Sequence, residues 1–337
     1  MKKPTLEQWQ QLYQAADQFK QSKCWNWMYD NNNFGVEDPQ TGDVAYCSIL
    51  GNAGKLVGIV AYTGEEGLLN LTEQLLGDTD SEEMQYKQQC LALAYGNRDE
   101  LRAEDLKTIH ALGLKFRGKG QWPQFRDYAP GKLPWFLDKQ GCSFLTHIIR
   151  QAVLIAERCK RESVLTGYPQ TPKLLVRVPV KGSASLLWED QYRSLEVKDN
   201  CLVLGISDEL LLRRLKNIKR SAGIWEVETF YCPIPIAEKK GDRPTFTQMC
   251  LFVEHQSGMI LGYRNFRALK EDGENCLDLF VELMSAEEAK PVQLLVRKKE
   301  TYYLFEEVSK QLGIPLTVVS ELENIKGIKE KLFQLMG

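Results

Sequence analysis

The densest group of side chains that could bind a ligand lies between residues 113 and 136, in GLKFRGKGQWPQFRDYAPGKLPWF. This aromatic–basic segment carries six aromatic rings, and its five basic residues against one acidic residue give it a local charge of +4. Aromatic rings can stack on bases while cations contact phosphates. The residues predicted to form a ligand-binding surface are Lys115, Arg117, Lys119, Trp122, Arg126 and Trp135. Such a surface suggests a protein or a single-stranded nucleic acid as the partner.

The same residues have a structural interpretation, which we favour. Large aromatic side chains serve packing first, and the three prolines of the segment fix the path of the chain. The segment has neither a helical nor a strand period, so we expect an ordered loop that is anchored by its rings. Its basic residues are the part that packing does not explain.

Acidic residues in the last hundred positions suggest a second kind of chemistry. The predicted order of elements there is hairpin, helix, strand, helix, strand, helix, which resembles ribonuclease-H-like folds. Enzymes with such folds use acidic residues on the first strand, a helix and a later strand end to hold two metal ions. The residues available for these roles are Glu254, Asp278 or Glu282, and Glu300. Because basic residues follow the later strand, the set is incomplete, and a metal-dependent nuclease or phosphoesterase is the alternative function.

No complete catalytic or metal-binding motif is found elsewhere. The three histidines, His110, His147 and His255, lie far apart in the sequence, and none has an obvious serine, cysteine or aspartate partner. The nine cysteines include no Cys-x-x-Cys pair, which argues against a structural zinc site. We therefore predict no catalytic residues, no metal ligands and no cofactor.

Composition narrows the possible partners and locations. The 337 residues include 43 basic and 45 acidic side chains, so the net charge of −2 gives no general attraction to nucleic acid or anionic membranes. No apolar run approaches the length that spans a bilayer, and the N-terminus lacks the apolar core of a secretory signal. Dispersed cysteines in an odd number fit a reducing compartment. These features predict a cytoplasmic protein without a membrane partner.

The elements that must position these residues fall into two groups, as a chain of this length suggests. The first group comprises a capped helix at 5–21, a hairpin of strands at 43–51 and 56–64, a helix at 65–76, a strand at 89–95 and a helix at 144–159. Prolines near residue 170 indicate a boundary. We therefore expect an N-terminal domain at 1–167 and a C-terminal domain at 173–337.

The second group contains most of the predicted strands. These are strands at 173–180 and 201–206, a half-exposed alternating strand at 224–231, a hairpin of 246–254 with 259–266, and strands at 292–296 and 316–319. Helices are predicted to begin at Ser207 and to cover about 274–288, 301–312 and the C-terminus. The last two strands, joined through a helix, are expected to be parallel. The whole chain is thus predicted to be an α+β protein that ends in a β-β-α-β-α-β-α unit.

Two stretches resemble the modules of one bacterial family. WNWMYDNNNFGVEDPQTGDVAYCSILG, together with GLKFRGKGQWPQFRDYAPGKLPW, is similar to its N-terminal module. The run from SGMILGYRNF through PVQLLVRKKE to LGIPLTVVSEL is similar to its C-terminal module. The family consists of domains of unknown function, so the resemblance implies a two-module bacterial cytosolic protein and no site residues. From the residues themselves we expect a non-enzymatic binding or regulatory protein.

Overall fold

The protein forms two compact units, each with its own sheet. The computed structural model describes residues 2–54, 56–77, 83–162, 173–180, 186–195 and 201–336. One unit contains Met1–Pro130 and Pro134–Lys198, and the other contains Gly131–Leu133 and Asp199–Gly337. Helices and mixed sheets together give the predicted α+β class. Among the described helices, none combines the length and apolar character needed to cross a membrane.

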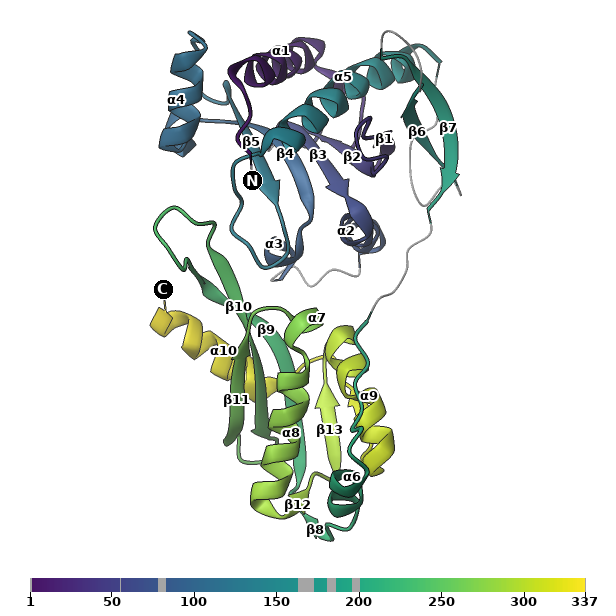
Figure 1. Ribbon diagram of the computed structural model, residues 1–337, viewed down its shortest axis with the longest axis vertical. Coiled ribbons are helices and arrows are strands. Elements are labelled where there is room, and N and C mark those ends of the chain that lie inside the picture. The colour runs from purple at the N-terminus through teal and green to yellow at the C-terminus, as the bar shows by residue number, and fades with distance from the viewer. Residues whose placement is uncertain are drawn as a thin grey trace. The chain divides into compact units, whose positions relative to one another are not determined.

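The first unit is built on a seven-stranded sheet (Figure 1). Its strands are β1 (Phe34–Glu37), β2 (Val44–Leu50), β3 (Gly58–Thr63), β4 (Cys90–Gly96), β5 (Trp122–Tyr128), β6 (Lys173–Pro179) and β7 (Trp188–Ser194). They lie in the order β5-β4-β3-β2-β1-β6-β7, and all neighbours are antiparallel except β1 and β6. The hairpin predicted from the sequence is confirmed by the pairing of β2 with β3.

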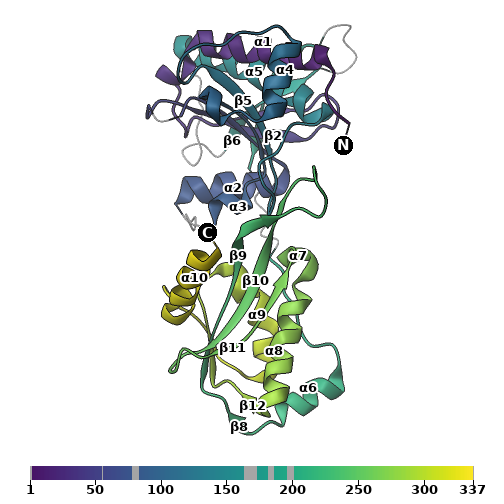
Figure 2. The ribbon, with the colours of Figure 1, turned by 90° about the vertical axis from the view of Figure 1, so that its left-hand side faces the viewer.

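Helices cover both faces of this sheet. They are α1 (Leu6–Ser22), α2 (Gly64–Leu76), α3 (Met84–Lys87), α4 (Ala103–Ala111) and α5 (Lys139–Glu162), with short 3-10 turns at Cys24–Asn26 and Arg98–Glu100. The amphipathic α1 and α5 pack on one face and supply most of the main core, while α2 packs on the opposite face (Figures 1 and 2). The predicted capping box at the start of α1 is present, since Thr5 and Gln8 exchange hydrogen bonds of 3.0 and 3.2 Å.

Two expectations about the first unit are corrected. Residues 122–128 form the edge strand β5 instead of a loop without a strand period. An edge strand tolerates Pro123, because its missing N–H need not face a neighbour. The boundary also differs: β6 pairs in parallel with β1, so the compact units part between Lys198 and Asp199 and not at 167–173. The proline-rich stretch at 168–172 lies outside the described residues.

The second unit contains a mixed five-stranded sheet. Its strands are β9 (Ile224–Ile236), β10 (Thr245–Glu254), β11 (Ile260–Phe266), β13 (Gln293–Val296) and β14 (Leu316–Val318), in the order β11-β10-β9-β13-β14. Strands β9, β13 and β14 are parallel, and β10 is antiparallel to both of its neighbours. The predicted parallel pairing across the β13–β14 crossover is therefore confirmed. A two-stranded pair of β8 (Arg220–Ser221) and β12 (Ala289–Lys290) lies apart from this sheet.

Helices also cover both faces of the second sheet. They are α6 (Glu209–Lys216), α7 (Leu269–Asp272), α8 (Glu274–Glu287), α9 (Lys299–Leu312) and α10 (Glu323–Met336). Helices α8 and α9 pack on one face around Phe252, Phe280 and Phe305, and α10 packs on the other around Phe230 (Figure 2). The ring centroids of Phe252 and Phe280 lie 5.7 Å apart in a stacked arrangement. Two covered faces bury the central strand on both sides.

Two predictions for the second unit are wrong. Residues 201–206 are not a strand; the main chain of Ile206 instead pairs with the side chain of Gln311 on α9. Residues 224–231 are not a half-exposed strand, since seven of these eight residues are buried. Alternating polar residues usually mark a solvent-facing side, but here α10 covers that side.

Candidate functional site

Three predicted site residues stand in solvent on one short stretch. Lys115, Arg117 and Lys119 are exposed, and none has a hydrogen-bond or ion-pair partner within the part of the chain that the structure describes. The intervening Leu114 and Phe116 pack against the core of the first unit. Lys115 and Arg117 alternate with these two residues and are exposed, and Lys119 lies in the turn between Gly118 and Gly120. We call Lys115, Arg117 and Lys119 the cation row.

Trp122 lies at the other end of the glycine turn that follows the cation row. It opens β5 opposite Gly96, and its partly buried ring lies 5.7 Å from that of Phe116. The rings continue inward through Tyr13, whose ring is 6.0 Å from that of Phe116 and stacked on it. The aromatic rings of this part of the segment thus mainly pack against the core, as we expected from the structural interpretation of the sequence.

Arg126 and Trp135 are used inside the first unit. Arg126 is 8% exposed and forms two hydrogen bonds, of 2.9 and 2.6 Å, to the carboxylate of Asp105 on α4. Its guanidinium also lies 5.3 Å from the centre of the Phe136 ring. Trp135 pairs through its main chain with Asp127, and its ring packs against the guanidinium of Arg102 at 5.5 Å. The structure therefore does not bring the six predicted residues into one surface.

The acidic residues considered for a nuclease do not converge. Glu254 lies opposite Trp225, at the amino end of β9, and accepts hydrogen bonds from the main chain and hydroxyl of Ser257. Glu300 begins α9, beyond the carboxyl end of the parallel strand β13, at the opposite end of the sheet. Glu282 of α8 forms an ion pair with Arg264. Within the described ranges, no three His, Cys, Asp or Glu side chains are placed to hold a metal ion.

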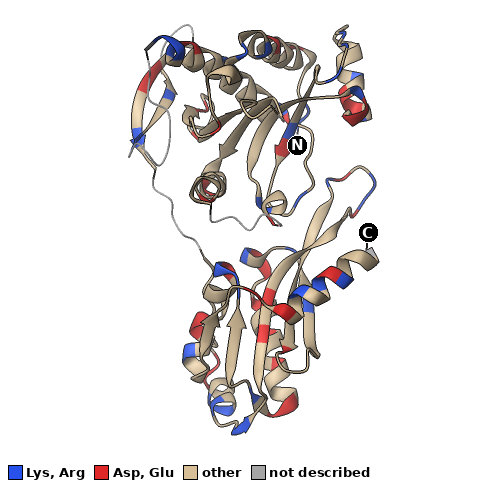
Figure 3. Ribbon diagram, turned by 180° about the vertical axis from the view of Figure 1, so that it is seen from behind, with Lys and Arg blue, Asp and Glu red and all other residues tan. Residues whose placement is uncertain are grey.

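The second unit instead buries a carboxylate among cations, which the sequence did not reveal. Glu228 on β9 is 2% exposed. It accepts a hydrogen bond of 2.9 Å from Arg297, and its Oε1 lies 3.1 Å from Nζ of Lys298 and 3.8 Å from Nζ of Lys329. Figure 3 shows the acidic positions on the central strand and the basic positions on α10. Burial alone would raise the pKa of Glu228, but the neighbouring Lys298, Lys329 and Arg297 outweigh it and lower the pKa.

A second carboxylate on the same side of β9 binds a histidine. Glu226 is fully buried, and its Oε1 lies 2.7 Å from Nδ1 of His255. The two residues are 29 positions apart, so no motif search over short spacings finds them. The available signal was indirect: a parallel central strand is normally covered on both faces, so its polar residues need internal partners.

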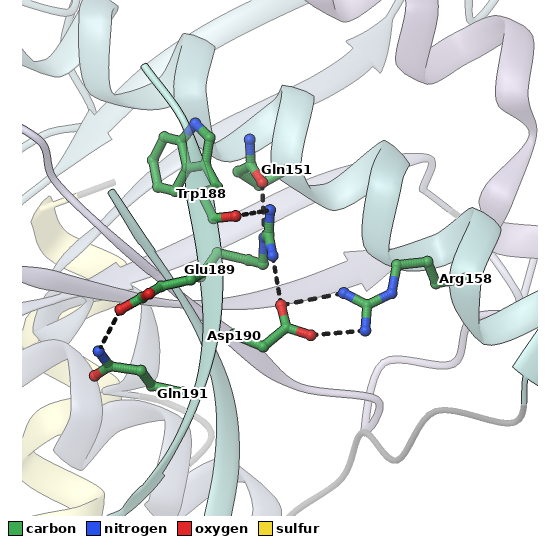
Figure 4. A network of polar contacts seen from close by, with 7 residues as sticks. Gln151, Arg158, Trp188, Glu189, Asp190 and Gln191 are labelled. Carbon is green, nitrogen blue, oxygen red and sulfur yellow. Dashed lines mark hydrogen bonds and ion pairs between the residues drawn. The ribbon is translucent and has the colours of Figure 1, made fainter. Parts of the chain in front are cut away.

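Figure 4 shows a third polar network, which joins α5 to the β6–β7 hairpin of the first unit. Asp190 of β7 accepts two hydrogen bonds from Arg158, of 3.1 and 2.7 Å, and a further one from Arg177. Arg177 also donates to Gln151 and to the carbonyl of Trp188. Hydrogen bonds from Arg158 hold the pKa of Asp190 below its usual value against the opposing effect of burial, and Arg177 lowers it further. These mutually satisfied charges fasten the hairpin to the helix.

The thiols and the remaining histidines offer no activated group. None of the nine cysteines, each within the described residues, forms a disulfide. Burial raises the pKa of Cys24 to about 11 and that of Cys142 to about 12, so these thiols stay protonated. Burial lowers the pKa of His147, with a further contribution from Arg150.

Two family models match the chain, one in each unit. A family model described as Domain of unknown function (DUF7309) matches residues 9–177, which run from α1 into β6. A second model, described as Domain of unknown function (DUF6930), matches residues 211–333, from α6 into α10. The two-module resemblance expected from the sequence is therefore confirmed. A search of curated proteins finds no match.

Proposed function

We propose that this protein is a binding protein whose first unit holds an anionic partner at the cation row. The chain belongs to the family described as Domain of unknown function (DUF7309). The observation that carries the proposal is the presentation of Lys115, Arg117 and Lys119 on one stretch, exposed and without partners among the described residues. Three unneutralised charges at spacings of two residues match a regularly charged polymer better than a single small anion.

Single-stranded nucleic acid is the proposed partner. Its phosphates repeat along a flexible backbone, so a row of cations can bind it without a deep groove. Since Arg126 and Trp135 are committed to internal contacts, base stacking contributes little, and the binding is electrostatic and independent of sequence. The cysteines, none of which forms a disulfide, support a reducing, cytosolic location for this binding.

A ribonuclease-H-like fold is proposed for the second unit. The strand order β11-β10-β9-β13-β14, with only β10 antiparallel to β9, supports this likeness together with the order of helices. Metal-dependent enzymes of that class gather carboxylates near the first strand and a later strand end. Here the basic residues Arg297 and Lys298 follow β13 and bind Glu228 directly. This arrangement favours a binding role over a nuclease, because the buried carboxylate of Glu228 is already paired with the protein's own cations.

Fluorescence anisotropy with a labelled single-stranded 20-mer tests the proposed partner. If the cation row makes three phosphate contacts, log K should fall against log salt with a slope of about −2. Replacing the three residues together (Lys115→Ala, Arg117→Ala, Lys119→Ala) should weaken binding at least about tenfold and flatten that slope, since each lost contact removes about 0.7 from it.

A matched control keeps the total charge change equal. Lys219, Lys239 and Lys240 are exposed cations of the second unit, and their triple alanine variant should bind as the unaltered protein does. Equal losses in both triple variants would show non-specific attraction. Absence of binding at 50 mM salt would contradict the proposal, and binding of an acidic peptide in place of the oligonucleotide would assign the row to a protein partner.

A further inference from the structure

The buried carboxylate of Glu226 is saturated with donors. Its Oε1 accepts from Nδ1 of His255 at 2.7 Å and from Nδ2 of Asn324 at 2.8 Å, and its Oε2 accepts from the main-chain N–H of Ile325 at 3.3 Å. Ile325 is in the first turn of α10, whose N-terminal end carries a partial positive charge. Both oxygens of this carboxylate therefore face hydrogen-bond donors, and a helix N-terminus lies beside it.

The main chain of His255 is also fixed by hydrogen bonds. Its main-chain N–H donates to Ile224 at 2.9 Å, and its carbonyl accepts from Asn324 at 2.8 Å. Because the other neighbours of the Glu226 carboxylate are donors, we assign Nδ1 of His255 as the donor of the 2.7 Å contact, and the tautomer with its proton on Nδ1 carries the lone pair on Nε2. The side chain is 44% exposed although Glu226 is completely buried. Nδ1 of the ring faces Glu226, and Nε2 has no hydrogen-bond partner among the described residues.

In catalytic triads and in metal-binding histidines a carboxylate on Nδ1 fixes the orientation and tautomer of the ring and leaves Nε2 as the reactive nitrogen. Histidine can also form covalent intermediates as a nucleophile. We infer that Nε2 of His255 is a nucleophilic centre for acyl transfer from small esters, with Glu226 and Asn324 as positioning residues. This inference concerns the second unit and is independent of the proposed binding function.

The step conserves atoms and charge. The Nε2 lone pair attacks the ester carbonyl, the C–N bond forms, and the C–O bond breaks as the alcohol leaves as its anion. The proton on Nδ1 stays in the hydrogen bond to Glu226, which stabilises the positive charge on the acylated ring. Water then cleaves the acyl–N bond, which yields the carboxylic acid, protonates the leaving alkoxide and restores the neutral imidazole.

The surroundings of His255 favour a neutral or cationic ester. The adjacent Glu254 carboxylate, which is fixed by Ser257, adds negative charge beside the ring. That charge repels phosphoryl donors and other anionic electrophiles. A metal centre is a poorer fit, because no three ligand-type side chains come together within the described ranges.

Hydrolysis of p-nitrophenyl acetate by the full chain tests the inference. His255→Gln should lower the protein-dependent rate of p-nitrophenolate release at least about tenfold. His110, an exposed histidine on α4 without a carboxylate partner among the described residues, provides the control. His110→Gln should leave the rate unchanged. Equal small losses in the two variants would overturn the inference.

The role of Glu226 has a readout that does not depend on turnover. In protein labelled with ¹⁵N-histidine, His255 should show the tautomer with the proton on Nδ1, and Asn324→Ala should shift its population toward the Nε2–H form. Glu226→Gln should abolish the Nδ1–H tautomer where thermal melting shows that the variant remains folded. An Nε2–H tautomer for His255 in the unaltered protein would overturn the inference whatever the variants do.

Discussion

The charged side chains in two regions of this protein lie in opposite environments, one exposed to solvent and the other buried. In the first unit, the cation row leaves Lys115, Arg117 and Lys119 in solvent without partners among the described residues. In the second unit, Glu226 and Glu228 lie under a helix, and each is surrounded by donors or cations. The exposed charges cost the fold little and are available to a partner. The buried charges cost several kcal/mol each to desolvate and persist only because their partners are in place.

The difference shows where charge is structural and where it can serve binding. Within the aromatic–basic segment itself, Arg126 resembles the buried charges of the second unit, since it is buried and paired with Asp105. Residue type alone therefore does not separate a binding cation from a structural one. Burial and pairing do, and both are tested by comparing free energies of unfolding.

The largest effect is expected at Glu228. Glu228→Ala removes the buried carboxylate that faces Lys298 and Lys329, so the second unit should lose about 3–5 kcal/mol of stability. Native-state hydrogen exchange read by mass spectrometry measures this loss locally, as weaker protection of the amides of β9 and β10. Glu282→Ala, which removes an exposed partner of Arg264, should cost less than about 1 kcal/mol. If Glu228→Ala also costs less than about 1 kcal/mol, the buried charges of the second unit are no more important for stability than exposed ones.

A smaller loss is expected at Arg126 in the first unit. Arg126→Ala breaks the two-pronged contact with Asp105 and should cost about 3 kcal/mol in urea unfolding. Arg117→Ala, which removes an exposed side chain, should change stability by no more than about 0.5 kcal/mol. In the double variant Arg126→Ala/Asp105→Ala the losses should be less than additive, because the two residues share one interaction. Additive losses would mean that the pair is not coupled.

The smallest effect is expected at Asp190, which is half-way between the two cases. Its pKa is lowered in the folded protein, so its contribution is fully present above the unfolded-state pKa of about 4 and is lost as pH falls through the folded value. Asp190→Asn should cost about 1 kcal/mol at pH 7, since the pair is partly exposed. The difference between the two proteins should shrink below pH 4. A difference that stays constant down to pH 2 would show that the carboxylate charge contributes nothing.

Local sequence determined the elements whose signals are local. The capping box at Thr5, the glycine turn between β2 and β3 and the hydrophobic stripe of α5 each specify their element without distant contacts. The parallel pairing of β13 with β14 could also be predicted, because two neighbouring strands joined through a helix are normally parallel and form a right-handed crossover. Strand β5 could not be predicted in this way, since Pro123 interrupts a strand pattern that only an edge position permits.

The exposure of the charged residues was decided by the tertiary structure. The sequence placed Lys115, Arg117 and Arg126 in one segment, but only the packing of α4 against β5 buries Arg126 and leaves the other two in solvent. Glu226 and Glu228 alternate as solvent-facing residues do, and α10, nearly a hundred positions later, covers them. The physical reason is that a side chain's exposure depends on what folds over it. That information resides in distant residues and not in the local spacing.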